Sequence, residues 1–309
     1  MRRIAILLAL SALLTGVACS QKSEKTDSAK SSTSQGKESY RSPLIGAYVA
    51  EVPGSPEASQ MLQLAHSMGI NVLYNYALPS GDERTVKEYL DEAQTLDVQV
   101  IVSLKDFYDQ VDSENSFEQW GNTNEDAAIK VVRTFEGHPA VWGFGITDEN
   151  PESPADLNAW QKTLETRYAK IKKVTTRPVM ATLVGWSADS SAERQDFLEA
   201  LSGSFDVLNL DYYPVPCGDM ANVSEVARDL TNIGQQDGWF TLQVFDWTAY
   251  NDPVCDNGRL PTEDEMLQMG RDALDHGAHN IMLYSLFDIS KNMTQQDIVR
   301  RVIAELKAH

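Results

Sequence analysis

Cysteine is scarce in this chain of 309 residues, which has three, at positions 19, 217 and 255. Neither Cys217 nor Cys255 belongs to a CxxC motif, and no HxxxH motif accompanies them. Metal clusters need three or four grouped ligands, and redox pairs usually have CxxC spacing, so we expect no metal and no redox centre. In an oxidising compartment a lone pair favours a disulfide over two independent buried thiols. We therefore predict a Cys217–Cys255 bridge that stiffens two neighbouring loops.

Positive charge is also in short supply. The chain has 26 basic and 45 acidic residues, a formal net charge of -19 and an isoelectric point near 4.6. A polyanion such as nucleic acid, or an anionic lipid surface, is a poor partner for such a protein. Neutral or cationic ligands fit better.

A long, mostly apolar run is found near the N-terminus, where Ile4–Leu14 follows two arginines and precedes small residues. Residues 1–19 have the pattern of an export signal and are too short for a stable membrane span. We therefore expect the protein to leave the cytoplasm.

Cys19 stands where a bacterial lipoprotein signal places its lipidated cysteine, and the polar residues 20–42 are typical of the tether that follows such an anchor. Gly16 replaces the usual leucine three residues earlier, so ordinary signal cleavage after a small-x-small pattern is the alternative. We predict a lipoprotein that is periplasmic or on the cell surface and contacts the membrane only through its lipid.

No phosphate-binding GxGxxG motif follows the first apolar run, which disfavours a doubly wound nucleotide-binding sheet. Eight apolar runs alternate with amphipathic helical patterns, and no internal linker divides them. This alternation predicts one domain at 43–309, a single (β/α)8 TIM barrel of the α/β class. The runs are 44–51, 71–78, 98–108, 140–150, 177–186, 205–215, 239–247 and 279–289.

The predicted strands end in carboxylates mixed with Trp and Tyr, and such barrels build their sites at these ends. Acidic and aromatic side chains together are typical of a sugar-binding surface, because hydroxyls take hydrogen bonds while the ring face stacks. Loop packing is the alternative role for the aromatic residues. The predicted ligand contacts are Glu51, Tyr76, Asp106, Trp186, Tyr212, Gln243 and Trp247. Lys105 lies near the end of the third run and either pairs with Asp106 or contacts substrate.

The stretch GHPAVWGFGITDENP at 137–151 resembles the fourth-strand motif of the clan A glycoside hydrolases, which are retaining barrel glycosidases. The resemblance covers the barrel in element order. It implies that Glu149 is the general acid/base, with Asp148 in the place of an asparagine that normally contacts the sugar 2-hydroxyl. The alternative for Glu149 is a structural acid held by a salt bridge or a helix cap.

The same family has a glutamate nucleophile at the end of strand seven, where this chain has Gln243. A neutral amide cannot replace a carboxylate in that role. Three interpretations remain open: Asp246 or Asp211 supplies the second carboxylate, the N-acetyl group of the substrate attacks with Asp148 orienting it, or catalysis is lost. We therefore predict a monomeric, cofactor-free glycoside hydrolase-like protein, with a surface glycan-binding barrel as the alternative.

Overall fold

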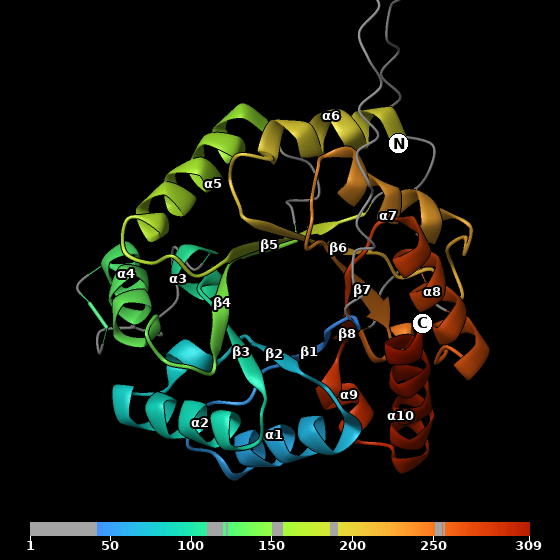
Figure 1. Cartoon of the computed structure of the whole chain (residues 1–309), viewed down its shortest axis with the longest axis horizontal. Helices are drawn as coiled ribbons and strands as arrows, with labels where there is room; N and C mark the ends of the chain where they lie inside the picture. The colour runs from blue at the N-terminus through green and yellow to red at the C-terminus, as the bar shows by residue number, and fades with distance from the viewer. Residues whose placement is uncertain are drawn as a thin grey trace, which may run out of the picture. The chain divides into compact units, whose positions relative to one another are not determined.

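Eight parallel strands close into a barrel in this computed structural model, with helices around it (Figure 1). The structure describes residues 42–109, 120–121, 123–149, 157–185, 191–250, 255 and 257–309. The strands are β1 (Ile45–Val49), β2 (Val72–Asn75), β3 (Gln99–Ser103), β4 (Val141–Asp148), β5 (Val179–Val184), β6 (Val207–Asp211), β7 (Trp239–Gln243) and β8 (Asn280–Tyr284). Each pairs with its sequence neighbours, and β8 pairs with β1. The predicted single (β/α)8 barrel is confirmed.

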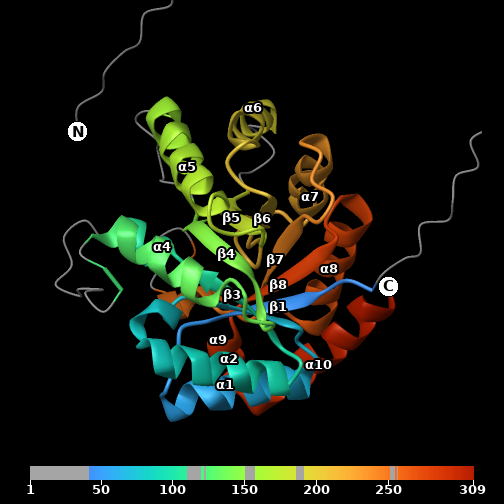
Figure 2. The same ribbon diagram turned by 60° about the vertical axis from the view of Figure 1, so that its left-hand side comes forward.

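The helices surround the strands in sequence order (Figures 1 and 2). They are α1 (Pro56–Met68), α2 (Glu83–Thr95), α3 (Lys105–Asp109), α4 (Asn124–Phe135), α5 (Leu157–Lys172), α6 (Ser191–Leu201), α7 (Asn222–Asn232), α8 (Glu263–His276), α9 (Leu286–Ser290) and α10 (Met293–Ala308), with 3-10 turns η1 (Leu78–Ser80) and η3 (Trp247–Tyr250). Side chains cap several helix starts, as the sequence indicates; Thr262, for example, forms a capping box with Glu265.

Two of the predicted apolar runs contain more than a strand. The run 98–108 divides into β3 and the short helix α3, and the run 279–289 divides into β8 and α9. An apolar run does not reveal by periodicity where a strand ends and a buried helical turn begins. Both short helices stand at the carboxyl ends of their strands, so they bring Lys105, Asp106 and Asp288 to the rim of the barrel.

Apolar side chains fill both faces of the strands. The larger cluster lies between strands and helices, and a smaller one fills the barrel with Tyr48, Val72, Tyr74, Ile101, Met180, Val207, Trp239 and Met282. Burial on both faces is expected of a parallel barrel and explains why its strands are continuously apolar. At Gly145 a Cβ atom would overlap the Tyr74 side chain, so this position on β4 needs glycine.

Within the described residues, no helix is both long enough and apolar enough to cross a membrane. Cys19 lies outside the described residues, so its lipidation stays a prediction.

One ion pair is deeply buried between two barrel helices. Arg194 on α6 donates through its Nε atom to Asp229 on α7, and the two side chains are 1% and 5% exposed. Burial raises the pKa of Asp229, while the hydrogen bond from Arg194 opposes that change. The pair therefore depends on both of its members.

We expect Arg194→Leu to lower the free energy of unfolding by about 3–5 kcal/mol, because it leaves a buried carboxylate without its cation. Urea unfolding followed by circular dichroism measures the change. Arg300→Leu is the matched control: Arg300 pairs with the exposed Asp297, so its loss should cost less than about 1 kcal/mol. If Arg194→Leu and Arg300→Leu lowered the free energy of unfolding equally, burial of the Arg194–Asp229 pair would not be the reason for the effect.

Candidate active site

Four strands end in a residue with an amide or carboxyl side chain at the carboxyl-terminal rim of the barrel. These residues are Asn75 on β2, Asp148 on β4, Asp211 on β6 and Gln243 on β7. Parallel strands in a closed barrel bring all their carboxyl ends to one rim, which is where barrel enzymes hold their reacting groups. Asp148, Asp211 and Gln243 are among the predicted site residues, and each ends its strand at this rim.

Asp148 is held by two donors from neighbouring strand ends. The Tyr76 hydroxyl donates to its Oδ1 atom at 3.0 Å, and the Lys105 Nζ atom donates to its Oδ2 atom at 2.7 Å. The Lys105 Nζ atom also lies 5.0 Å from the centre of the Tyr76 ring, close enough for a cation–π contact. Lys105 thus pairs with the carboxylate of Asp148, a partner that the sequence alone did not indicate.

Glu149 follows directly and adopts a left-handed backbone conformation with a φ angle of 62°. Such a conformation is uncommon for residues other than glycine. The residue is exposed, and its backbone carbonyl accepts a hydrogen bond from Thr147 at 3.2 Å. Partial desolvation of the carboxyl and the negative charge of Asp148 raise the pKa of Glu149, while Lys105 opposes the rise.

Asp211 lies inside the barrel mouth and is 2% exposed. Burial raises its pKa well above the ordinary value, and the charges of Asp148 and Glu149 raise it further. Asn209, two residues earlier on β6, donates to the Asp211 carboxylate at 3.2 Å and to the Tyr48 hydroxyl at 2.8 Å. Burial and these two negative charges therefore favour the protonated form of Asp211 more than solvent would.

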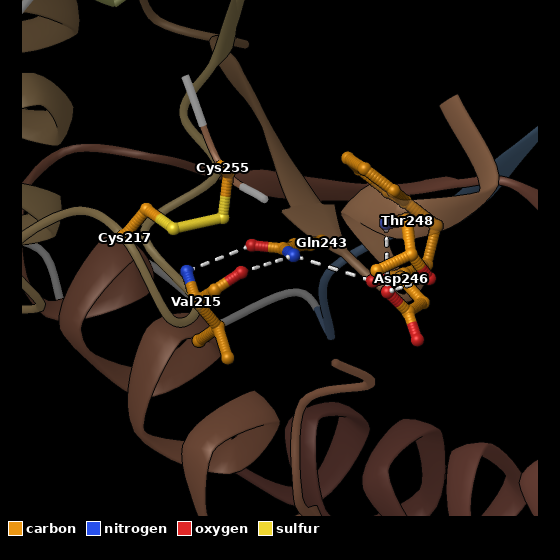
Figure 3. The surroundings of a disulfide bond; sticks show 7 residues. Val215, Cys217, Gln243, Asp246, Thr248 and Cys255 are labelled. Atoms are coloured by element: carbon orange, nitrogen blue, oxygen red, sulfur yellow. Dashed lines mark hydrogen bonds between the residues drawn. A yellow bond between two sulfur atoms is a disulfide. The ribbon is translucent and has the colours of Figure 1, made fainter. Parts of the chain in front are cut away.

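The Gln243 side chain is fully buried, and three hydrogen bonds join it to backbone groups (Figure 3). Its Oε1 atom accepts from the Val215 amide at 2.9 Å, and its Nε2 atom donates to the carbonyls of Val215 at 2.6 Å and Phe245 at 3.2 Å. The amide thereby fastens the loop after β6 to the end of β7. Contact of Gln243 with substrate stays a prediction.

The predicted disulfide is confirmed: Cys217 and Cys255 are bonded, with sulfur atoms 2.04 Å apart (Figure 3). The bridge joins the loops after β6 and β7, close to the segment that Gln243 fastens. A covalent link and a buried amide thus restrain the same sector of the rim.

Asp246 is engaged within its own loop. Its Oδ1 atom accepts from both the backbone amide and the hydroxyl of Thr248, each at 2.8 Å (Figure 3). This is the local pattern by which an aspartate initiates a turn, here the one that begins η3. Asp211, in contrast, interacts electrostatically with Glu149, whose negative charge raises the pKa of Asp211.

Aromatic rings line the rim from β1 around to β8. Tyr48 and Tyr76 stack with ring centres 5.2 Å apart, and Tyr213 contacts Trp247 edge to face at 6.0 Å. The cluster continues through Phe245, Tyr250, Tyr284 and Phe287. The Tyr212 hydroxyl, however, donates to the Asp219 carbonyl at 3.1 Å within its loop. Trp186 lies outside the described residues.

Two further predicted contact residues, Glu51 and Asp106, are half-buried at the rim. Burial raises the pKa of each carboxyl, which shows that their environment is partly desolvated. Glu51 accepts a hydrogen bond from the Ala50 amide at 3.1 Å. Among the residues that the structure describes, no group of three or more His, Cys, Asp or Glu side chains is placed to hold a metal ion.

Sequence reasoning missed Asn209, Tyr284 and the Lys105–Asp148 pair. A polar residue inside an otherwise apolar strand, such as Asn209 in VLNLD, is a signal that could have pointed to a buried hydrogen-bond network. Tyr284 is the last residue of β8, and the end of a strand is where such barrels place their site residues.

No protein-family model matches the chain, and no curated protein matches it in sequence. Solved structures do match. A candidate alpha-L-fucosidase from Bacteroides thetaiotaomicron is 11% identical with a TM-score of 0.58, covering 92% of this chain and 99% of that one. A class V chitinase from Pseudomonas fluorescens is 10% identical with a TM-score of 0.57, covering 84% and 99%. The GH113 beta-mannanase of Alicyclobacillus acidocaldarius is 12% identical with a TM-score of 0.54, covering 86% and 98%.

At identities this low the comparison shows a shared fold, which does not by itself establish a shared activity. The chain has the (β/α)8 barrel fold that is also found among glycoside hydrolases.

We expect Gln243→Glu to destabilise the protein by about 2–4 kcal/mol, because a carboxylate would face the carbonyls of Val215 and Phe245. The introduced carboxyl is favoured protonated in the folded state, so its cost should be small near pH 4 and grow towards neutral pH. Urea unfolding at several pH values measures this. The control is Gln63→Glu on the exposed surface of α1, which should change stability little at any pH. A Gln243→Glu variant as stable as the wild type at neutral pH would contradict the role of Gln243 in holding the loop after β6 to the end of β7.

Proposed function

We propose that this protein hydrolyses glycosidic bonds, with Glu149 as the general acid. The observation that carries the proposal is the position of Glu149: an exposed carboxyl of raised pKa, next to a fixed Asp148, at the carboxyl-terminal rim of the barrel. A general acid must hold its proton near working pH and be accessible to substrate; the raised pKa and the exposure of Glu149 support these two requirements. The resemblance of residues 137–151 to the fourth-strand motif of barrel glycosidases supports the same role.

In this reaction the bond between the anomeric carbon and the leaving oxygen breaks, and the leaving oxygen takes the proton of Glu149. The oxygen of a water molecule bonds to the anomeric carbon, and its proton passes to a second carboxylate. We assign that second role to Asp211 over Asp246, since Asp211 interacts electrostatically with Glu149 whereas Asp246 is hydrogen-bonded to Thr248. Asp211 serves only when ionised, so the rate should rise with pH until Glu149 loses its proton.

The proposed substrate is a poly- or oligosaccharide. Tyr76, Trp247, Tyr250 and Tyr284 offer ring faces or edges at the rim, and the neighbouring carboxylates can accept hydrogen bonds from sugar hydroxyls. Attack by an N-acetyl group of the substrate is a second route to the same products. It would need Asp148 to orient the amide, but both Asp148 oxygens already accept hydrogen bonds from Tyr76 and Lys105.

One observation favours a second function, glycan binding without hydrolysis. Gln243 stands at the strand-seven position where retaining barrel glycosidases have their nucleophile, and its amide is occupied by backbone groups. Asp211 is also buried, and its protonated form is a poor base. A barrel with these two features could hold a sugar without cleaving it.

The test is release of reducing ends from a panel of bacterial, algal and plant polysaccharides by the purified full-length chain. We expect Glu149→Gln to lower the rate about 100-fold to 10,000-fold, the usual loss when a general acid is removed. Glu88→Gln, which alters an exposed glutamate on α2, should leave the rate unchanged. Binding retained by wild type and Glu149→Gln, with no cleavage anywhere in the panel, would instead support the glycan-binding function.

We also propose that the chain is exported and anchored by a lipid on Cys19. The supporting observation is the sequence of residues 1–19 followed by the polar stretch 20–42. In a bacterial host, the full-length chain should incorporate a labelled fatty acid, and Cys19→Ala should not. Export of the protein without label would indicate ordinary signal cleavage near Gly16–Ala18.

A further inference from the structure

Asp148 has a role in this site that follows from its partners. Its side chain is 11% exposed, and both of its oxygens accept hydrogen bonds, one from a phenol and one from an ammonium group. A partly buried carboxylate with two such donors is fixed in one orientation. Tyr76 and Lys105 therefore set the position of the Asp148 carboxyl next to Glu149 in the chain.

The two donors also hold each other. Tyr76 comes from the residue after β2 and Lys105 from the first residue of α3, and the lysine nitrogen lies over the tyrosine ring. Burial and the charge of Asp148 raise the pKa of Tyr76 well above its usual value, so the phenol remains a donor. Lys105, Tyr76 and Asp148 thus form a closed triangle, in which each member contacts the other two.

Glu149 experiences two opposite charges from this triangle. The carboxylate of Asp148 favours the protonated form of Glu149, and the ammonium of Lys105 favours the ionised form. The lysine side chain is 29% exposed, so solvent only partly screens it. Other titratable groups face the same region: Tyr48 from β1, Asp106 from α3, Asp211 from β6, Tyr213 from the loop after β6, and Tyr284 from β8.

We propose that Lys105 is a positioning residue that holds Asp148 against Tyr76 and so sets the pH at which Glu149 releases its proton. The inference rests on the proposed role of Glu149 as the acid, but the charge arrangement can be measured without a substrate. Lys105 itself need not touch the sugar. It acts on Glu149 through its own charge and through the position that it gives Asp148.

Two substitutions should act in opposite directions. The quantity to follow is the midpoint at which the Glu149 carboxyl releases its proton. Lys105→Met removes the cation and should raise that midpoint by about one pH unit. Asp148→Asn removes the neighbouring anion and should lower the midpoint of Glu149 by a similar amount. A merely structural role for the triangle would not produce shifts of opposite sign.

The experiment is a carbon-13 NMR titration of the full-length chain labelled at the aspartate and glutamate carboxyls, with Glu149→Gln identifying the signal. Lys105→Arg retains the cation and should keep the midpoint near that of the wild type. Lys87→Met, which removes an exposed lysine paired with Asp91 on α2, is the matched control and should shift nothing at Glu149. If Lys105→Met does not fold, two variants still test the proposal. Asp148→Asn should lower the midpoint of Glu149, and Lys105→Arg should leave it near the wild-type value.

An unchanged or lowered midpoint in Lys105→Met would overturn the proposal, as would a raised midpoint in Asp148→Asn. The outcome is separable from that of the polysaccharide panel. If the two midpoints shift in opposite directions but no polysaccharide is cleaved, the charge arrangement is supported and the hydrolytic role is not. If a polysaccharide is cleaved but neither midpoint shifts, the hydrolytic role is supported and the proposed role of Lys105 is not. Where cleavage occurs, the alkaline limb of its pH profile should move in parallel with the NMR midpoint.

Discussion

The pairing of β8 with β1 is the contact on which the rest of the structure depends. Ile45, Gly46 and Ala47 lie in register with Ile281, Met282 and Leu283, and this ladder closes the sheet on itself. Closure leaves no free sheet edge and requires every strand to tilt in the same sense. It also brings Tyr284 against Tyr48, so the aromatic lining of the rim is continuous across the seam. Residues more than two hundred positions apart thereby share one site.

The carboxyl groups at the rim of the barrel have different electrostatic environments. Asp148 has an ammonium and a phenol as donors, Asp211 has an amide and almost no solvent, and Glu149 has solvent and a charged neighbour. The same chemical group thus exists in three environments within one barrel mouth. Differences of this kind separate the protonation states of acids that would otherwise titrate together.

Much of this arrangement could be predicted from the sequence, and the part that could not has a physical reason. Eight apolar runs indicated the barrel because strand and helix periods are local properties, and the disulfide followed from a pair of cysteines in loops that a barrel makes neighbours. The Lys105–Asp148 pair could not be predicted, because it depends on which way two side chains turn at adjacent strand ends. Likewise, the sequence placed Gln243 at the rim but did not reveal that its amide faces the backbone of Val215.

The sector between β6 and β7 has two restraints of different chemical kinds. The bridge between Cys217 and Cys255 forms only where thiols are oxidised, whereas the hydrogen bonds of Gln243 form in any compartment. A chain that folds before it meets an oxidant would already have Val215 fastened to the end of β7. The amide can thus hold the loop after β6 against the end of β7 whether or not the two cysteines are oxidised.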